Sequence, residues 1–158
     1  MELKTLSEIE IISAASSKIN EVDFENLTFG NVFTDHMLVC DYKDGAWQKP
    51  VIEPYAPFMI DPSSKVFHYG QAIFEGMKAY KDEQDDVWLF RPDENFHRFN
   101  KSASRMAMPE VPEDIFMGGL HKLLEIEKDW VKKGKGNTLY IRPFMIATGH
   151  GVIAAPSS

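Results

Sequence analysis

The order of apolar and polar positions predicts strands in the first half of the chain and helices later. Residues 31–42 are rich in β-branched and aromatic residues, and Asp44-Gly45 directly after them is typical of a hairpin turn. Four prolines between residues 50 and 62 predict an extended, irregular stretch, because each proline fixes its φ and restricts the preceding residue. Apolar residues at every third position from Leu3 to Ile12 favour a weak helix or a loosely held arm.

The second half of the chain predicts more strands and two helices. Residues 73–80 and 87–91 are β-like runs joined by a short polar link, which suits antiparallel neighbours. A helix is expected from residue 93 to the prolines near 109, and a second from about 113 to 133. Residues 137–147 form the last expected strand. The pattern therefore predicts an α+β fold, with a largely antiparallel sheet and two helices packed on it.

Composition and charge exclude several function classes. Of 158 residues, 44% are hydrophobic, enough for one folded domain or slightly more. The net charge of −7 argues against nucleic-acid binding, which needs clustered Lys and Arg. One cysteine, Cys40, makes no internal disulfide, and the five histidines are too dispersed for a local zinc motif, so no metal is expected. Neither a membrane span of about 20 apolar residues nor a signal peptide is recognisable, which predicts a cytoplasmic protein.

Tyr140 and Arg142 form a candidate binding pair. Because side chains alternate along a strand, both point to the same face. The pair suits a carboxylate, since arginine's planar fork takes two oxygens and the tyrosine hydroxyl donates as well. The alternative is an arginine at the rim that pairs with one of the chain's 24 acids. Pro143 lacks a donor for the sheet, which predicts an edge or a bulge at this point.

Three other positions allow a functional or a structural interpretation. Arg98 lies between two core aromatics of the first expected helix, where it faces either a cleft or solvent. Gly70 permits a tight turn that projects His68 or Tyr69 outward, and a buried tyrosine with a satisfied hydroxyl is the alternative. Lys78 lies in an apolar strand, where desolvation would favour the neutral amine of Schiff-base chemistry, but the pattern favours an edge or snorkelling lysine. None of these positions alone identifies an enzyme.

Six motifs occur in order between residues 27 and 147. They are Phe29-Gly30, Phe33-Thr34-Asp35-His36-Met37-Leu38, Phe67-His68-Tyr69-Gly70-Gln71-Ala72-Ile73-Phe74-Glu75-Gly76-Met77-Lys78-Ala79-Tyr80, Leu89-Phe90-Arg91-Pro92-Asp93-Glu94-Asn95, Ser102-Ala103 and Leu139-Tyr140-Ile141-Arg142-Pro143. Together they closely resemble the branched-chain amino-acid aminotransferases, and a set of long motifs is more specific than one signature.

The resemblance implies a domain organisation. Members of the family are fold-type IV pyridoxal-phosphate enzymes, with a small N-terminal α/β domain, a linker and a larger C-terminal domain, and they work as homodimers. Residues 27–147 are then the small domain, 1–26 an N-terminal arm or weak helix, and 148–158 the start of the interdomain linker, with the cofactor domain absent from this chain.

The resemblance also implies one cofactor-binding residue, Arg98, and one substrate-binding residue that acts across the dimer, Tyr69. Arg98 matches the arginine that holds the phosphate of pyridoxal 5′-phosphate, and Tyr69 matches a tyrosine that reaches into the partner subunit's pocket. The family's cofactor-linked lysine, and the acid that partners the pyridine nitrogen, belong to the C-terminal domain, and nothing in this sequence matches them. No catalytic residue is therefore assigned, and the chain alone is expected to be inactive.

The implied substrates are branched-chain amino acids and 2-oxoglutarate or glutamate. Phe29, Phe74 and Tyr140 match aromatic residues that seat the side chains of leucine, isoleucine and valine, and Arg142 matches the arginine that receives the distal carboxylate of glutamate. The parent enzyme would then transfer the amino group of these amino acids to 2-oxoglutarate in a ping-pong cycle. His150 departs from the pattern, because that position is often leucine.

Two alternatives remain open at this point. The first alternative is a free-standing, non-catalytic domain that associates with itself, which the missing lysine suggests. The second alternative is the small domain of another fold-type IV enzyme, such as a D-amino-acid aminotransferase or an aminodeoxychorismate lyase. The motif at residues 33–38 argues against this second alternative.

Overall fold

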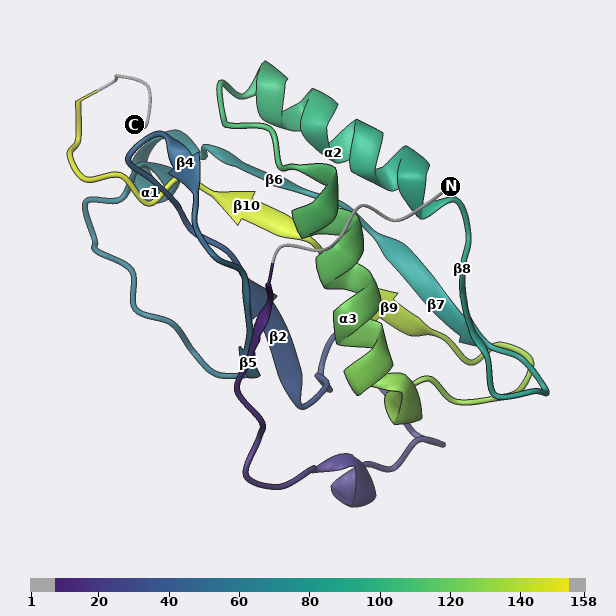
Figure 1. Ribbon diagram of the computed structural model, residues 1–158. Coiled ribbons are helices and arrows are strands. Elements are labelled where there is room, and N and C mark those ends of the chain that lie inside the picture. The colour runs from purple at the N-terminus through teal and green to yellow at the C-terminus, as the bar shows by residue number, and fades with distance from the viewer. Residues whose placement is uncertain (1–7, 154–158) are drawn as a thin grey trace.

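In the computed structural model, residues 8–153 are described, and they form short strands in several small sheets together with three α-helices (Figure 1). The strands are β1 (Glu10–Ile11), β2 (His36–Val39), β3 (Tyr42–Lys43), β4 (Ala46–Trp47), β5 (Val51–Pro54), β6 (Ala72–Phe74), β7 (Met77–Lys81), β8 (Val87–Leu89), β9 (Leu139–Ile141) and β10 (Phe144–Ile146). The helices are α1 (Lys65–Tyr69), α2 (Pro92–Arg105) and α3 (Gly119–Ile126). This arrangement confirms the predicted α+β class.

The N-terminal region differs from the prediction. Instead of a weak helix, it contributes the short strand β1, which pairs in parallel with β5, and a 3-10 turn at Ile19–Glu21. The apolar positions before residue 8 lie outside the described residues. The stretch after Pro50 is not wholly irregular, because β5 also pairs antiparallel with β2. The hairpin at Asp44-Gly45 is confirmed, since β3 pairs with β4 and both turn residues have the positive φ that such turns need.

The longest antiparallel ladder pairs β6 and β7 with β10 and β9, and it is interrupted once without a change of register. The expected strand over 73–80 is divided into β6 and β7, and the expected strand over 137–147 into β9 and β10. Phe144 lies opposite Phe74, and Ile141 lies opposite Met77, so the same register holds on both sides of the break. The Pro143 carbonyl still accepts from the Glu75 N–H at 2.8 Å. Because proline has no N–H to return the second bond, the ladder opens at this level.

β9 is an edge strand, as the proline predicted, and the constant register shows that no bulge is needed. The prediction of two long continuous strands was wrong, because each of them is divided into two short strands.

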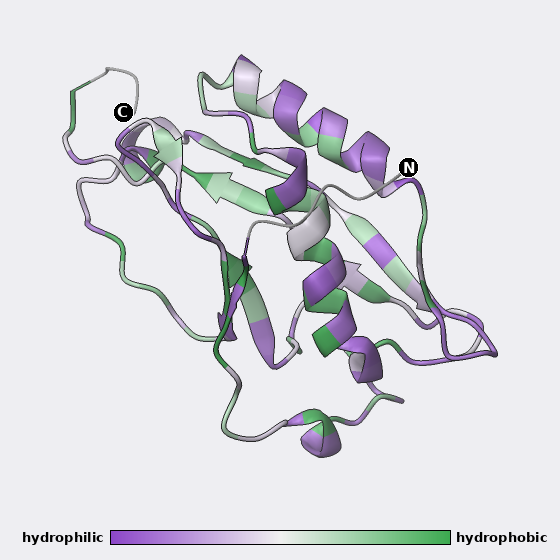
Figure 2. Cartoon of the chain, viewed as in Figure 1, coloured by the Kyte–Doolittle hydropathy of each residue, from purple (hydrophilic) through white to green (hydrophobic). Residues whose placement is uncertain are grey.

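Helices α2 and α3 pack on one face of this ladder, where the core lies. In β7, Met77 and Ala79 are buried while Lys78 and Tyr80 are exposed. The buried cluster joins strand residues to the apolar faces of both helices; it comprises Ile73, Met77, Ala79, Phe99, Ala103, Met108, Val111, Ile115, Phe116, Leu120, Leu124 and Val131. Figure 2 shows hydrophobic positions recurring at intervals along the largely hydrophilic α2, as expected for a helix with one buried face.

The second helical segment is shorter than predicted. It begins with a π-helical turn at Asp114–Gly118, continues as α3, and ends in a 3-10 turn at Lys128–Trp130. A β-carbon on Gly119 would lie 2.5 Å from Leu38 Cδ2, so this glycine lets α3 approach β2 closely. The regular helix stops before Glu127 and Trp130, whose side chains bond to residues at the start of β2.

Candidate functional site

The open face of the interrupted ladder carries an arginine that packs against two aromatic rings. Arg142 Nη2 donates to Tyr140 Oη at 2.9 Å, and the guanidinium carbon lies 4.5 Å from the centre of the Phe74 ring and 5.2 Å from that of Tyr140. The Phe29 ring meets the Tyr140 ring edge-on, with 5.0 Å between centroids. These contacts are cation–π and edge-to-face aromatic pairs. Four of the six predicted site residues are therefore together.

Arg142 has no acidic partner within residues 8–153. Its contacts there are the Tyr140 hydroxyl and the two aromatic rings, and its side chain is exposed. The alternative of a rim arginine neutralised by an acid is thus not what the described part of the chain shows. An arginine in apolar surroundings that keeps N–H groups available is suited to bind a carboxylate.

Gly76 provides the space for this cluster. In the ladder register it lies opposite Arg142, on the same face as Phe74. A β-carbon at residue 76 would lie 2.2 Å from Tyr140 Oη and 3.0 Å from its Cζ. Every other amino acid would therefore displace the Tyr140 hydroxyl and its hydrogen bond to Arg142.

Arg98 forms a second candidate group at the other side of the same strand segment. From α2, its Nε and Nη2 donate to the two carboxylate oxygens of Glu75 at 2.5 and 2.6 Å. Glu75 is only 4% exposed, whereas the Arg98 side chain is 64% exposed. Asn95 Nδ2 also donates to Glu75 Oε2, at 2.9 Å.

This network shifts the ionisation of both partners. The hydrogen bonds from Arg98 hold the pKa of Glu75 below its ordinary value, although burial of the carboxyl acts in the opposite direction. The bond to Glu75 correspondingly raises the pKa of Arg98. Both groups are therefore charged at neutral pH, and the helix presents a fixed guanidinium at the surface.

Sequence reasoning assigned no role to Glu75, although the alternation of the strand carried a signal. Ile73, Glu75 and Met77 share the buried face, so the alternation of side chains places the Glu75 carboxylate on the core side of the strand. A buried charge needs a paired group, and Arg98 on the covering helix supplies it.

Tyr69 lies apart from the aromatic cluster in its described contacts. It ends the short helix α1, which Gly70 terminates in the left-handed conformation with φ of 60°. Its hydroxyl donates to the carbonyl oxygen of Val152. Tyr69 and His68 are both exposed, which confirms the outward projection predicted at Gly70. A fully buried tyrosine was the wrong alternative.

Lys78 is a surface residue, as the sequence pattern favoured, and the desolvated alternative is wrong. Lys78 lies on the open face of β7, opposite Tyr140, and is exposed. The surface-lysine interpretation is the correct one. Within residues 8–153, no group of three or more His, Cys, Asp or Glu side chains is placed to hold a metal ion.

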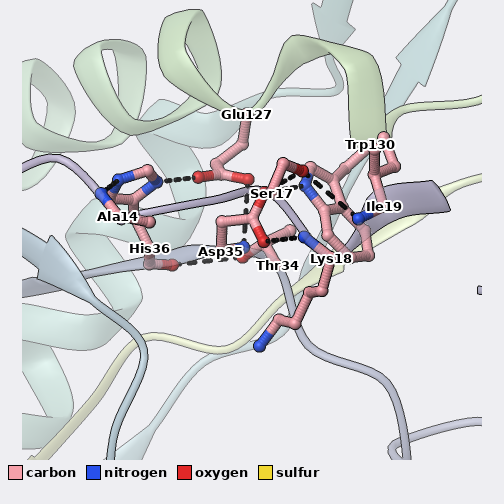
Figure 3. A network of polar contacts seen from close by, with 9 residues as sticks. All are labelled: Ala14, Ser17, Lys18, Ile19, Thr34, Asp35, His36, Glu127 and Trp130. Atoms are coloured by element: carbon pink, nitrogen blue, oxygen red, sulfur yellow. Dashed lines mark hydrogen bonds and ion pairs between the residues drawn. The ribbon is translucent and has the colours of Figure 1, made fainter. Parts of the chain in front are cut away.

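A buried polar network joins the N-terminal segment to β2 and the end of α3 (Figure 3). Glu127, 2% exposed, accepts from His36 Nδ1 at 2.5 Å and from the Asp35 N–H at 3.3 Å. Asp35 in turn accepts from Ser17 Oγ at 2.5 Å and Trp130 Nε1 at 3.1 Å. Burial disfavours the Asp35 carboxylate, but these hydrogen bonds and that from Lys18 N outweigh it and lower its pKa. Among residues 8–153, no buried side-chain nitrogen or oxygen lacks a hydrogen-bond partner, so this network is a structural one.

Among residues 8–153, none of the helices has the length and apolar character that crossing a lipid bilayer requires.

Comparison with known proteins relates the chain to one enzyme family. No family model matches it. It is 56% identical over 127 residues to branched-chain-amino-acid transaminase 1 of Bacillus subtilis, and 53% identical over 137 residues to a probable branched-chain-amino-acid aminotransferase of Staphylococcus epidermidis. These matches cover 80% and 86% of this chain but 36% and 38% of the relatives. The chain thus spans well under half the length of the curated relatives it matches.

Solved structures show the same fold at low sequence identity. A branched-chain amino acid aminotransferase from Escherichia coli matches 78% of this chain and 36% of that one, with a TM-score of 0.58 and 19% identity. The pyridoxal-phosphate form of a branched-chain amino acid aminotransferase from Thermobaculum terrenum matches 68% of this chain and 34% of that one, with a TM-score of 0.53 and 21% identity. The relatives and the shared fold place the chain in the branched-chain amino-acid aminotransferase family, of which it matches a partial, N-terminal region.

Proposed function

We propose that the chain supplies the substrate-pocket half of an enzyme that transfers the amino group of leucine, isoleucine or valine to 2-oxoglutarate, giving glutamate. Residues 27–147 form its small domain, and residues 148–158 begin the linker to a C-terminal domain. The observation that carries this proposal is Arg142, which packs against two aromatic rings and has no acidic partner among the described residues.

The arrangement suits two kinds of substrate in one pocket. The rings of Phe29, Phe74 and Tyr140 offer apolar surface to an aliphatic side chain. Arg142 offers its free N–H groups to the distal carboxylate of glutamate or 2-oxoglutarate, and the Tyr140 hydroxyl adds a further polar group. A ping-pong transfer needs this dual acceptance, because the amino donor and the amino acceptor occupy the same site in turn.

Arg98 fits the phosphate of pyridoxal phosphate. Its guanidinium is exposed and is held on one side by Glu75, which leaves N–H groups on the other side for phosphate oxygens. When bound in the complete protein, pyridoxal phosphate supplies the electron sink for amino-group transfer. Within this chain, Arg98 would anchor the phosphate and the aromatic cluster would orient the substrate.

The complete protein is proposed to act as a homodimer in the cytoplasm. Tyr69 supports the dimer, because it is exposed at the end of α1 and has no described contact with the Arg142 cluster of its own chain. It would contribute to the pocket of the partner subunit. Sedimentation of the full-length protein would give twice the monomer mass, and a monomer that retains full activity would refute the homodimer.

The substitution Arg142→Ala in the full-length protein tests the substrate assignment. Loss of the charge-assisted bond to the distal carboxylate should lower kcat/KM for glutamate about tenfold or more, with a smaller effect on leucine. Arg91→Ala is a matched control, because Arg91 is an exposed arginine that already pairs with Glu94. If Arg142→Ala affected both substrates equally, Arg142 would not be the receptor of the distal carboxylate.

A further inference from the structure

We propose that Glu75 is a positioning residue: it holds the Arg98 guanidinium in the orientation that binds the cofactor phosphate. The inference rests on the proposed function, in which Arg98 binds that phosphate, and assigns a role to a residue that touches neither cofactor nor substrate.

The geometry divides the guanidinium into a used and an available edge. Arginine has five N–H donors in a planar fork. Glu75 accepts from Nε and from Nη2, so one edge of the fork is fully engaged. One N–H of Nη1 and the second N–H of Nη2 remain side by side, and they point away from the end of the fork. Two oxygens of a phosphate fit that end as a bidentate pair.

Glu75 is itself held in place by groups other than Arg98. Asn95 Nδ2 and the Gly76 N–H both donate to Oε2, at 2.9 and 3.3 Å. The Glu75 N–H donates to the Pro143 carbonyl, so the backbone that carries this carboxylate is fixed in the ladder. A buried, fully bonded carboxylate thus restrains a long side chain that projects from the exposed side of α2. Such restraint lowers the entropy lost when a ligand binds.

If only its charge mattered, Glu75 would weaken phosphate binding by Arg98 instead of favouring it. A carboxylate beside a phosphate-binding arginine reduces the local positive potential, and its removal would strengthen phosphate binding if potential were decisive. If position is decisive, its removal weakens binding. The sign of the change therefore separates the two effects.

The experiment measures cofactor binding to the full-length apoprotein. Glu75→Gln removes the charge and keeps the size, whereas Glu75→Asp keeps the charge and shortens the reach. Dissociation constants are determined spectroscopically for pyridoxal phosphate and for pyridoxal, which lacks the phosphate. Glu94→Gln is the matched control, because Glu94 in the first turn of α2 pairs with the exposed Arg91, which directly precedes that helix.

Both Glu75 variants should weaken pyridoxal-phosphate binding about tenfold or more and leave pyridoxal binding unchanged. In an Arg98→Gln background, Glu75→Gln should have no further effect, because its action runs through Arg98. Glu94→Gln should bind like the wild type. If Glu75→Gln fails to fold, Glu75→Asp decides the question alone.

Three results would overturn the inference. Unchanged or tighter pyridoxal-phosphate binding in the Glu75 variants, while Arg98→Gln binds weakly, would refute positioning and leave the proposed function intact. Equal weakening of pyridoxal and pyridoxal phosphate would show a general structural effect. If Arg98→Gln bound pyridoxal phosphate normally, the phosphate role of Arg98 and the role of Glu75 would fail together.

Discussion

Replacing Gly76 by alanine tests whether the close approach of Tyr140 to the strand organises the arginine cluster. The added β-carbon would lie 2.2 Å from Tyr140 Oη, whereas an ordinary contact begins near 3.4 Å, so the hydroxyl must move by about 1.2 Å. Its 2.9 Å bond from Arg142 cannot survive a shift of that size in the wrong direction. The φ of Gly76 is not in the left-handed region, so the effect arises from space and not from backbone strain.

The expected cost is modest for stability and larger for the acidic substrate. Overpacking beside a half-buried ring should lower the free energy of unfolding by about 1 kcal/mol. Loss of the Tyr140–Arg142 bond should lower kcat/KM for glutamate about tenfold, with a smaller effect on leucine. Both quantities are measured on the full-length protein, by urea unfolding and by steady-state kinetics.

A double-mutant cycle isolates the contact. In a Tyr140→Phe background the 2.2 Å contact is absent and the nearest ring carbon, Cζ, lies 3.0 Å from the new β-carbon. Gly76→Ala should therefore cost much less there than in the wild type. Equal costs in both backgrounds, or wild-type kinetics with glutamate in Gly76→Ala itself, would show that the close approach does not organise the site.

Three further predictions concern stability and the polar networks. Glu127→Gln should lower the free energy of unfolding by about 2 kcal/mol, because it weakens the hydrogen bonds from Asp35 N–H and His36. The control Glu125→Gln, on the exposed side of α3, should change it by less than about 0.5 kcal/mol. Equal effects of the two substitutions in denaturant titrations would contradict the structural role of the network. Trp130→Phe should cost about 1 kcal/mol through the lost bond to Asp35, and a neutral result would show that this bond is dispensable. The stability difference between wild type and Glu75→Gln should be constant above about pH 4.5, the ordinary pKa of glutamate, and should shrink below it. The reason is that the pKa of Glu75 is depressed in the folded state, so the carboxylate's contribution is lost as the pH falls through that folded-state pKa. A difference that grows on acidification would contradict the depressed pKa.

The elements that sequence predicted well are those fixed by neighbouring residues. Helix α2 follows from the spacing of its apolar residues, from Pro92 at its start and from acids in its first turn. The hairpin follows from the conformational freedom of Asp44-Gly45. Both depend on contacts within a few positions, which a linear pattern displays.

The features that sequence did not predict depend on distant partners. The second helix ended early because Glu127 and Trp130 bond to Asp35, which lies 92 and 95 positions away. The division of two long strands depended on Pro143 facing Glu75 across the ladder, and no local pattern specifies that pairing. The site residues were named by resemblance. The register then places Phe74 on the same face as Tyr140 and Arg142, and a ring contact from outside the ladder adds Phe29.

Three consecutive residues connect the two proposed binding groups. Phe74 and Gly76 face the open side of the ladder, where they flank Arg142 and give Tyr140 its space, while Glu75 faces the core and bonds to Arg98. This division follows from the two-residue period of a strand, in which neighbours point to opposite faces. A shift of register by one residue would bury Phe74 and expose Glu75, and so remove both arrangements at once. The missing hydrogen bond at Pro143 weakens the ladder at this level, yet the Glu75–Pro143 bond and the carboxylate network keep the register fixed where both groups depend on it.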